Sequence, residues 1–198
     1  MNLQIAKPID VALDVDDVLY RSSEMEYHLK REFLAEEYEK LRSAETVEEK
    51  MHYSIRISEL SNRVPYNYLD PRWINIEAIT KLLECQLLSP QLRYSIVTAR
   101  GSCWEAAISD MFRSVDFDIP PNRVYGSKTN KVNFCKKMQF ATLLDDFPKT
   151  IYRFKWCDIE PIMVATEPRS EFRWQARNYD GVVLWSWADL DIALSRVL

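Results

Sequence analysis

Six short apolar runs, which alternate with segments of helical pattern, limit the folds open to this chain more than any other feature. Strands that alternate with helices are typical of a parallel sheet with helices on both faces. We therefore expect an α/β fold, a Rossmann-like three-layer sandwich with a mostly parallel sheet. The six runs are residues 9–15, 93–98, 123–126, 141–145, 161–165 and 181–184.

The segment of residues 22–62 interrupts this alternation directly after the first strand. Ser23-x-x-Glu26 and Thr46-x-x-Glu49 each have the capping-box pattern that starts a helix. Apolar residues then recur at near-helical spacing. We expect two helices here, which form a small helical cap. The predicted organisation is a core of residues 1–20 and 73–198 with a cap of residues 21–72.

Three of the apolar runs end in polar side chains. The carboxyl ends of parallel strands meet at the edge of the sheet where ligands bind. Carboxylates that gather there must be neutralised, and a hard divalent cation such as Mg²⁺ does this with oxygen ligands. The polar residues are Asp14, Asp16 and Asp17 after the first run, Thr98 at the end of the second, and Asp145 and Asp146 at the end of the fourth.

These residues also have plainer interpretations. Asp16 and Asp17 are compatible with an ordinary turn, because Asp is common in turns. Thr98 is compatible with a structural strand position, because β-branched residues favour strands. Two acidic strand ends in one α/β chain nevertheless favour a shared site.

A lysine would help to neutralise these carboxylates, and the chain offers two candidates. Lys128 and Lys131 both precede the strand that ends at Asp145. The 14-residue interval from Lys131 to Asp145 suits a helix, a loop and a strand. We therefore prefer Lys131.

The order of these motifs resembles a known superfamily. The stretches DVDDV and VTAR, then Lys131, then LLDDFP follow in the order of the four motifs of the haloacid dehalogenase-like phosphohydrolases. Within that superfamily the chain is most similar to the 5′(3′)-deoxyribonucleotidase group, with its helical insertion after the first motif. It departs from that group at residues 168–170, Pro-Arg-Ser, where such proteins often carry a Pro-Tyr-Asn-like stretch.

The resemblance implies a Mg²⁺-dependent phosphatase that acts through an aspartyl-phosphate intermediate. Asp14 would be the nucleophile that attacks phosphorus. Asp16 would be the general acid for the leaving alcohol and then the general base for water. Lys131 would balance charge on Asp14 and on the transferring phosphoryl group.

The resemblance also implies the ligands of the metal and of the phosphate. Mg²⁺ would be bound by Asp14, by Asp145 and by the backbone carbonyl of Asp16, with Asp146 holding a metal-bound water. The phosphoryl oxygens would be bound by the Thr98 hydroxyl and the backbone N–H of Ala99. Arg100 either contacts the substrate or closes a loop.

Aromatic residues beside the insertion suggest how a leaving group could be recognised. Tyr66, Tyr68 and Trp73 could stack on a nucleobase, or they could pack the insertion against the sheet. The favoured substrate is a small-molecule phosphate ester, specifically a (deoxy)nucleoside monophosphate.

The charge balance bears on the alternatives. The net charge of −4 and the pI of about 5.4 argue against broad nucleic-acid binding, although a local basic groove would permit it. A 3′-phosphatase on nucleic-acid ends is therefore the alternative enzyme. A non-catalytic binding protein of the same fold is the alternative of another class, but it would not need the nucleophile Asp14.

The sequence also excludes some settings. Four cysteines without CxxC spacing and only two histidines argue against a zinc site. The N-terminus lacks the apolar core of a signal peptide, and no apolar run approaches the length of a membrane span. We expect a soluble, cytoplasmic protein without a membrane partner.

Overall fold

All six expected strands are present in the computed structural model, which describes residues 7–61, 69–128, 130–166 and 170–198. The strands pair in parallel throughout, in the order β3-β2-β1-β4-β5-β6. The expected α/β fold is therefore confirmed. The strands are β1 (Ile9–Leu13), β2 (Leu92–Val97), β3 (Val124–Tyr125), β4 (Thr142–Asp145), β5 (Ile162–Val164) and β6 (Val182–Leu184).

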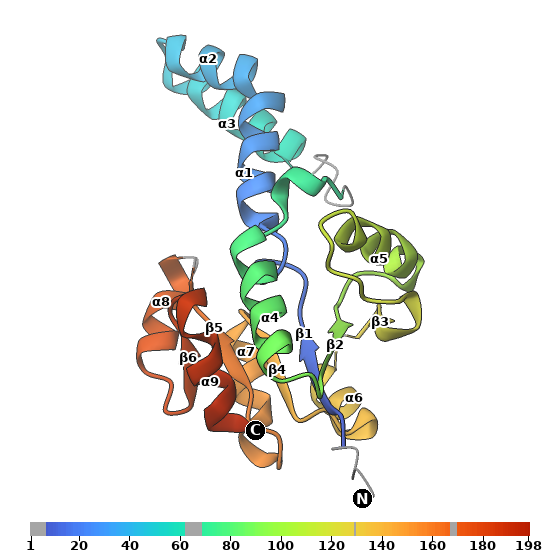
Figure 1. The fold of residues 1–198 in the computed structure, drawn as a ribbon. Coiled ribbons are helices and arrows are strands. Elements are labelled where there is room, and N and C mark those ends of the chain that lie inside the picture. The colour runs from blue at the N-terminus through green and yellow to red at the C-terminus, as the bar shows by residue number, and fades with distance from the viewer. Residues whose placement is uncertain (1–6, 62–68, 129, 167–169) are drawn as a thin grey trace, which may run out of the picture.

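Helices cover both faces of this sheet (Figure 1). One face packs against α4 (Ile76–Leu88), α5 (Glu105–Arg113) and α9 (Leu190–Val197). The other packs against α6 (Lys131–Met138), α7 (Pro148–Tyr152) and α8 (Ser170–Arg177). Short 3₁₀ helices span Pro71–Trp73, Ser102–Trp104, Pro121–Arg123, Arg153–Trp156 and Trp187–Asp189.

The residues of β1 show why this sheet lies in the middle of the molecule. Val11 and Leu13 belong to the apolar cluster on one face, whereas Ala12 belongs to the cluster on the other. All three are fully buried. Side chains of a strand alternate between faces, so a strand buried on both sides must be apolar throughout.

The insertion contains three helices rather than the two expected from the sequence. They are α1 (Ser22–Phe33), α2 (Ala35–Ser43) and α3 (Val47–Ser61). The missed break lies at Leu34, which is fully buried and leaves helical geometry at ψ 8°. No glycine or proline marks this position, so the break depends on burial of the Leu34 side chain.

Of the two capping boxes expected at the starts of these helices, only one forms. The Thr46 capping box forms as expected, since the Thr46 N–H donates to Glu49 Oε2 at 3.1 Å and the Glu49 N–H donates to Thr46 Oγ1 at 3.2 Å. Ser23 is not a cap. Its backbone N–H donates to the Asp17 carboxylate at 2.8 Å, so Asp17 supplies the acceptor at the start of α1.

The insertion leaves the sheet at the carboxyl end of β1 (Figure 1). In that view α1 rises away from the sheet, and α2 and α3 pack against each other at its far end. The two connecting segments pair, because Tyr20 bridges Ile74 and the Arg21 N–H donates to the Trp73 carbonyl at 2.8 Å. The exact division into core and cap, at residues 21–72, stays a prediction.

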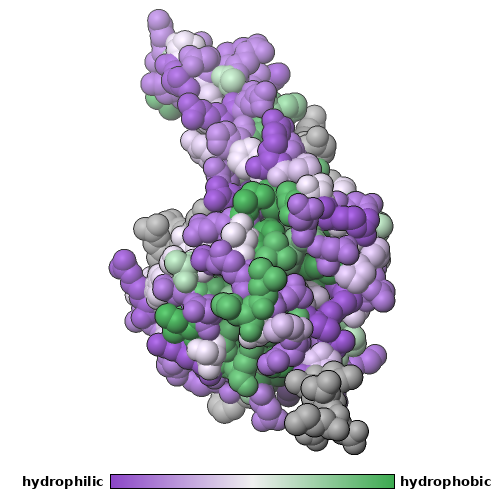
Figure 2. Space-filling view, in the orientation of Figure 1, coloured by the Kyte–Doolittle hydropathy of each residue, from purple (hydrophilic) through white to green (hydrophobic). Residues whose placement is uncertain are grey.

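The hydropathy of the surface differs between the insertion and the sheet domain (Figure 2). The far end of the insertion is mostly hydrophilic, whereas apolar residues gather over α4, where Leu87 and Leu88 are exposed. Among the described residues, no helix combines the length and the apolar character that crossing a membrane requires.

Candidate active site

The nucleophile candidate Asp14 follows β1 at the centre of the sheet. Leu13 is in register with Leu144 of β4, and the Asp14 N–H donates to the Leu144 carbonyl at 2.9 Å. This register brings Asp14 next to Asp145, the last residue of β4. The two acidic strand ends therefore meet because their strands are neighbours, as expected for a site at the carboxyl edge of a parallel sheet.

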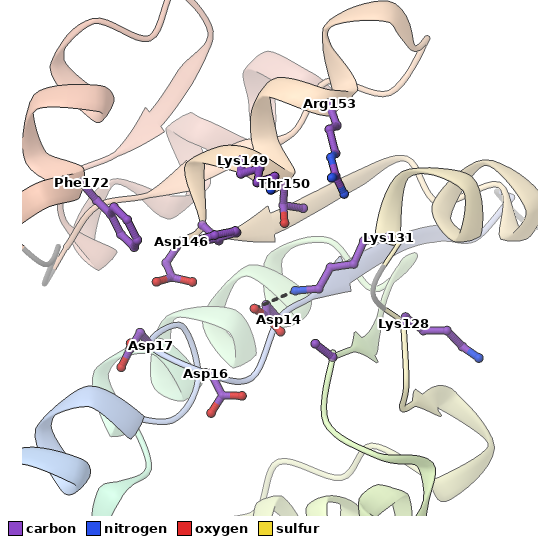
Figure 3. Close-up of a pocket in the computed structure, with 12 residues that line it drawn as sticks. Asp14, Asp16, Asp17, Lys128, Lys131, Asp146, Lys149, Thr150, Arg153 and Phe172 are labelled. Atoms are coloured by element: carbon purple, nitrogen blue, oxygen red, sulfur yellow. Dashed lines mark ion pairs between the residues drawn. The ribbon is translucent and has the colours of Figure 1, made fainter. Parts of the chain in front are cut away.

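Lys131 joins these two carboxylates. Its ammonium nitrogen lies 2.7 Å from Asp14 Oδ2 and 2.6 Å from Asp145 Oδ2 (Figure 3). Lys131 is the first residue of α6, which begins after the Asn130 cap. Figure 3 shows the ammonium of Lys128 pointing away from Asp14. The structure thus selects Lys131 over Lys128 as the partner of Asp14.

Burial and charge together set the protonation of Asp14 and Lys131. Burial raises the pKa of the Asp14 carboxyl to about 7, although the ammonium of Lys131 acts in the opposite direction. Burial alone would lower the pKa of Lys131, but Asp14 and Asp145 outweigh that effect and raise it. Lys131 therefore keeps its charge and favours the carboxylate form of Asp14.

The donor set of Asp14, Asp145 and Asp146 fits a divalent cation. Each residue offers a carboxylate oxygen, and these three oxygens lie within 4.8 Å of one another. The side chain of Asp146 makes no hydrogen bond or ion pair with another described residue. Burial, and then the charges of Asp14 and Asp145, raise the pKa of Asp146 to about 9. Three acids beside one ammonium leave excess negative charge, which a hard cation such as Mg²⁺ would balance.

The tight turn after Asp14 aims the next two carboxylates in different directions. Asp17 adopts φ 56°, a left-handed conformation that Asp tolerates. Its carboxylate turns toward the start of α1, whereas the Asp16 carboxylate turns toward Arg100. The Arg100 guanidinium contacts both oxygens of Asp16, and only a tenth of its side chain is exposed. Asp16 therefore joins no carboxylate cluster, and any metal contact would come from its backbone carbonyl.

Thr98 and Ala99 follow β2 beside this turn. Thr98 is fully buried, and its hydroxyl accepts the Arg100 N–H at 3.2 Å. Its carbonyl accepts the N–H of Lys128 at 2.9 Å, so the Thr98 segment also fixes the loop before α6. Ala99 lines the cavity described below, whereas Thr98 is not among its lining residues.

Among the predicted aromatic binding residues, Trp73 lies in the described part of the chain. Trp73 packs against the His28 ring, with centroids 5.2 Å apart, and does not line the cavity. Its position supports packing between the insertion and the sheet. Tyr66 and Tyr68 lie outside the described residues, as do Pro168 and Arg169 of the departing stretch.

An open cavity of about 400 Å³ lies above the carboxylates (Figure 3). It brings together the sequence candidates Asp14, Asp16, Asp17, Ala99, Lys128, Lys131 and Asp146. Its other wall was missed by sequence reasoning. The missed residues are Phe147, Lys149, Thr150, Arg153 and Phe172.

Four of the five missed residues come from one segment of the sequence. Phe147, Lys149, Thr150 and Arg153 directly follow the Asp145–Asp146 pair, so a helix that starts there must face the same edge. The basic residues at positions 149 and 153, one helical turn apart, were the available signal. Phe172 had no such signal, because it comes from α8 and meets the Phe147 ring at a centroid distance of 5.6 Å.

Comparison with known proteins places this geometry in a fold class. No family model matches the sequence, and no curated protein is significantly similar to it. Solved structures, however, match nearly the whole chain. A protein named as a haloacid dehalogenase-like hydrolase from Burkholderia xenovorans matches with a TM-score of 0.58 at 13% identity, over 96% of this chain and 98% of that one.

Two further structures match over similar lengths. A protein named as a β-phosphoglucomutase from Thermotoga maritima has a TM-score of 0.54 at 15% identity, covering 96% of this chain and 100% of that one. A 2-haloacid dehalogenase from Pseudomonas syringae has a TM-score of 0.51 at 13% identity, covering 96% and 99%. The chain thus has the fold of the haloacid dehalogenase-like hydrolases. The deoxyribonucleotidase subgroup stays a prediction.

Proposed function

We propose that this chain is a Mg²⁺-dependent phosphatase that acts through an aspartyl-phosphate intermediate. The observation that carries the proposal is the contact of Lys131 with Asp14 and Asp145 at the floor of an open cavity. A carboxylate that attacks a phosphate dianion must overcome charge repulsion. A buried ammonium beside the attacking group reduces that repulsion where it arises.

Asp14 is the proposed nucleophile. Its Oδ1 accepts the Val15 N–H at 2.8 Å, and its Oδ2 contacts Lys131 at 2.7 Å. These two contacts fix the orientation of the carboxylate before a substrate binds, which lowers the entropic cost of attack. Attack on phosphorus forms the Asp14 acyl phosphate and releases the alcohol. Water then hydrolyses the acyl phosphate, which releases inorganic phosphate and restores Asp14.

Asp16 is the proposed acid and base for these two steps. It lies two residues beyond the nucleophile, and its carboxylate lines the same cavity. It would protonate the leaving alkoxide in the first step and take a proton from water in the second. Arg100 holds its side chain in place.

The proposed Mg²⁺ ligands are the carboxylates of Asp14 and Asp145 and the backbone carbonyl of Asp16, with Asp146 holding a metal-bound water. When bound, the cation would neutralise phosphoryl charge and orient the phosphate. Asp145 is preorganised for this role, because its Oδ1 accepts the Phe147 N–H at 2.8 Å while Oδ2 contacts Lys131. In the same proposal, the Thr98 hydroxyl and the Ala99 N–H bind phosphoryl oxygens.

The proposed substrate is a (deoxy)nucleoside monophosphate. The Phe147 and Phe172 rings on the cavity wall support this proposal, because aromatic faces bind nucleobases by stacking. The insertion would cover the leaving group when it closes over the cavity.

All four cysteines carry free thiols, which fits the reducing cytoplasm as the proposed setting.

A phosphate-release screen tests this function. The panel contains nucleoside monophosphates, sugar phosphates, 3′-phosphorylated oligonucleotides and an aryl phosphate, each with Mg²⁺ and with excess EDTA. We expect release from mononucleotides that stops in EDTA and returns with Mg²⁺. An acid-quenched sample should carry phosphate on the peptide that contains Asp14. Preference for the oligonucleotides would favour the 3′-phosphatase, and binding without release would favour a non-catalytic protein.

A further inference from the structure

The cavity contains cations that the proposed chemistry does not use. Lys128, Lys149 and Arg153 line it together with Lys131. Lys131 is occupied by two carboxylates, but none of the other three forms an ion pair with a described residue. Lys128 has a packing role, because its ammonium lies 5.0 Å from the centre of the Phe134 ring. Lys149 and Arg153 have no comparable partner in the described part of the chain.

The spacing of Lys149 and Arg153 is mildly unfavourable, and a bound anion would remove this cost. They lie four residues apart, with Lys149 in α7 and Arg153 at the start of the following 3₁₀ helix, so two like charges occupy neighbouring positions one turn apart. An opposite-charge pair at the same spacing lies in α2. There Lys40 contacts Glu36 at 2.7 Å.

Lys149 and Arg153 line the cavity from the segment that follows Asp146, whereas Asp14, Asp16 and Asp17 line it from the segment that follows β1. Figure 3 shows Thr150 and Arg153 extending from one segment toward the cavity, and Asp14, Asp16 and Asp17 on the other side. A phosphate at Asp14 would direct its leaving group into the space between. A guanidinium, an ammonium and a hydroxyl are the groups that bind a phosphate through charge-assisted hydrogen bonds.

We propose that Lys149 and Arg153, assisted by the Thr150 hydroxyl, form a second phosphate subsite, so that the preferred substrate is a small bisphosphorylated molecule. This inference rests on the proposed phosphatase chemistry and changes its preferred substrate from a nucleoside monophosphate to a small molecule that carries a second phosphate. The cavity volume of about 400 Å³ suits a small molecule rather than a polymer. One phosphate is hydrolysed at Asp14, and the other stays intact and anchors the leaving group.

Binding to a catalytically disabled protein tests the subsite directly. In the Asp14→Asn background, calorimetry compares a nucleoside 5′-monophosphate with its 3′,5′-bisphosphate, and a hexose 6-phosphate with its 1,6-bisphosphate. We expect the bisphosphate of one pair or both to bind about 10-fold more tightly or better, because hydrogen bonds to charged groups are strong. The pair that shows the preference identifies the leaving group as a nucleoside or a sugar.

Variants test whether Lys149 and Arg153 cause the tighter binding of the bisphosphate. Lys149→Gln with Arg153→Gln should abolish it, and Arg153→Gln alone should remove most of it. Lys136→Gln with Lys137→Gln, on exposed positions of α6, makes the same charge change outside the cavity and should preserve it. The mutated side chains Lys149 and Arg153 are exposed, and circular dichroism checks the fold of each variant.

The outcomes separate this inference from the function on which it rests. Equal affinity within both pairs, or a preference that survives the Lys149 and Arg153 changes, would overturn the subsite. Tighter binding of a 3′-phosphorylated oligonucleotide than of either bisphosphate would overturn the small-molecule class. A preference that the variants abolish, in a wild-type protein that hydrolyses no monoester, would keep the subsite and reject the phosphatase.

Discussion

The guanidinium of Arg100 contacts both carboxylate oxygens of Asp16, with Nη2 2.5 Å from Oδ1 and Nε 3.0 Å from Oδ2. Arg100 also lies over the Tyr20 ring, 5.6 Å from its centre. The Tyr20 hydroxyl in turn accepts the Asp70 N–H at 3.0 Å. Tyr20 and Asp70 lie on the two segments that connect the insertion with the sheet. Arg100 therefore links the proposed acid-base residue to both connections.

Replacing Arg100 should affect the proton-transfer steps most. We expect Arg100→Gln to lower kcat/KM for a nucleoside monophosphate by about 10-fold or more, because kcat/KM covers only the steps up to alcohol release and a misplaced general acid loses rate steeply. The loss on p-nitrophenyl phosphate should be smaller, since a nitrophenolate leaves without protonation. Steady-state kinetics on the two esters measure this difference.

Arg93→Gln is the matched control for Arg100. Arg93 forms an ion pair with Asp10 near the amino end of β1, away from the cavity. Arg93→Gln should leave the ratio of kcat/KM for the nucleotide to kcat/KM for p-nitrophenyl phosphate unchanged. An equal loss on both esters in Arg100→Gln would show that Arg100 supports the fold rather than positioning Asp16.

Asp14→Asn should abolish turnover and preserve the fold. The amide is nearly isosteric but is a poor nucleophile, so the rate should fall by about 10⁴-fold or more. Lys131 keeps its contact with Asp145 at 2.6 Å. Tm should therefore stay within about 4 °C of wild type, since 1 kcal/mol corresponds to roughly 2–4 °C at this chain length.

Phosphate release and thermal unfolding check both parts of the Asp14 prediction. Asp118→Asn, at a side chain that is 73% exposed, is the matched control and should retain activity. Wild-type rates in Asp14→Asn would exclude the covalent mechanism. A large fall in Tm would mean that the loss of activity reports unfolding.

Asp146→Asn should stabilise the metal-free protein at mildly basic pH. The pKa of Asp146 is raised from 3.8 to about 9, so the folded state keeps a proton in this range that the unfolded state has lost. Stability therefore falls as the pH rises through this window, and the variant avoids the loss. We expect a gain of about 2 kcal/mol after allowance for partial solvent exposure, vanishing toward pH 4.

Urea unfolding in chelator, from acidic to mildly basic pH, measures this difference. Mg²⁺ should reverse the order at basic pH, because it binds the folded wild type and stabilises it by about 2.7 kcal/mol at 100 times its Kd. Asp146→Asn should gain less from Mg²⁺. Equal stabilisation of both proteins by Mg²⁺ would remove Asp146 from the metal site.

Phe147→Ala should weaken recognition of a nucleobase. Phe147 lines the cavity and its side chain is 43% exposed, so little core packing is lost. We expect kcat/KM for a nucleotide, relative to an aryl phosphate, to fall by about 10-fold, because stacking contributes roughly 1–3 kcal/mol per base. Trp174→Ala, at an exposed position of α8 outside the cavity, is the control. An unchanged ratio in Phe147→Ala would place the base elsewhere.

The sequence alone determined the sheet and the centre of the site. Six apolar runs became six parallel strands. Asp14 and Asp145 met because their strands are neighbours, and Lys131 reached both from the start of α6. These features are predictable because they depend on strand direction and on short intervals along the chain. Topology alone brings the ends of parallel strands together.

Tertiary structure decided the rest. The break at Leu34 depends on burial and not on a helix-breaking residue. Arg100 pairs with Asp16, 84 positions earlier in the chain, and Trp73 packs on His28 instead of entering the cavity. Phe172 reaches the cavity from α8. The contacts of Arg100, Trp73 and Phe172 each join distant segments, and they depend on how whole layers pack and not on any local pattern.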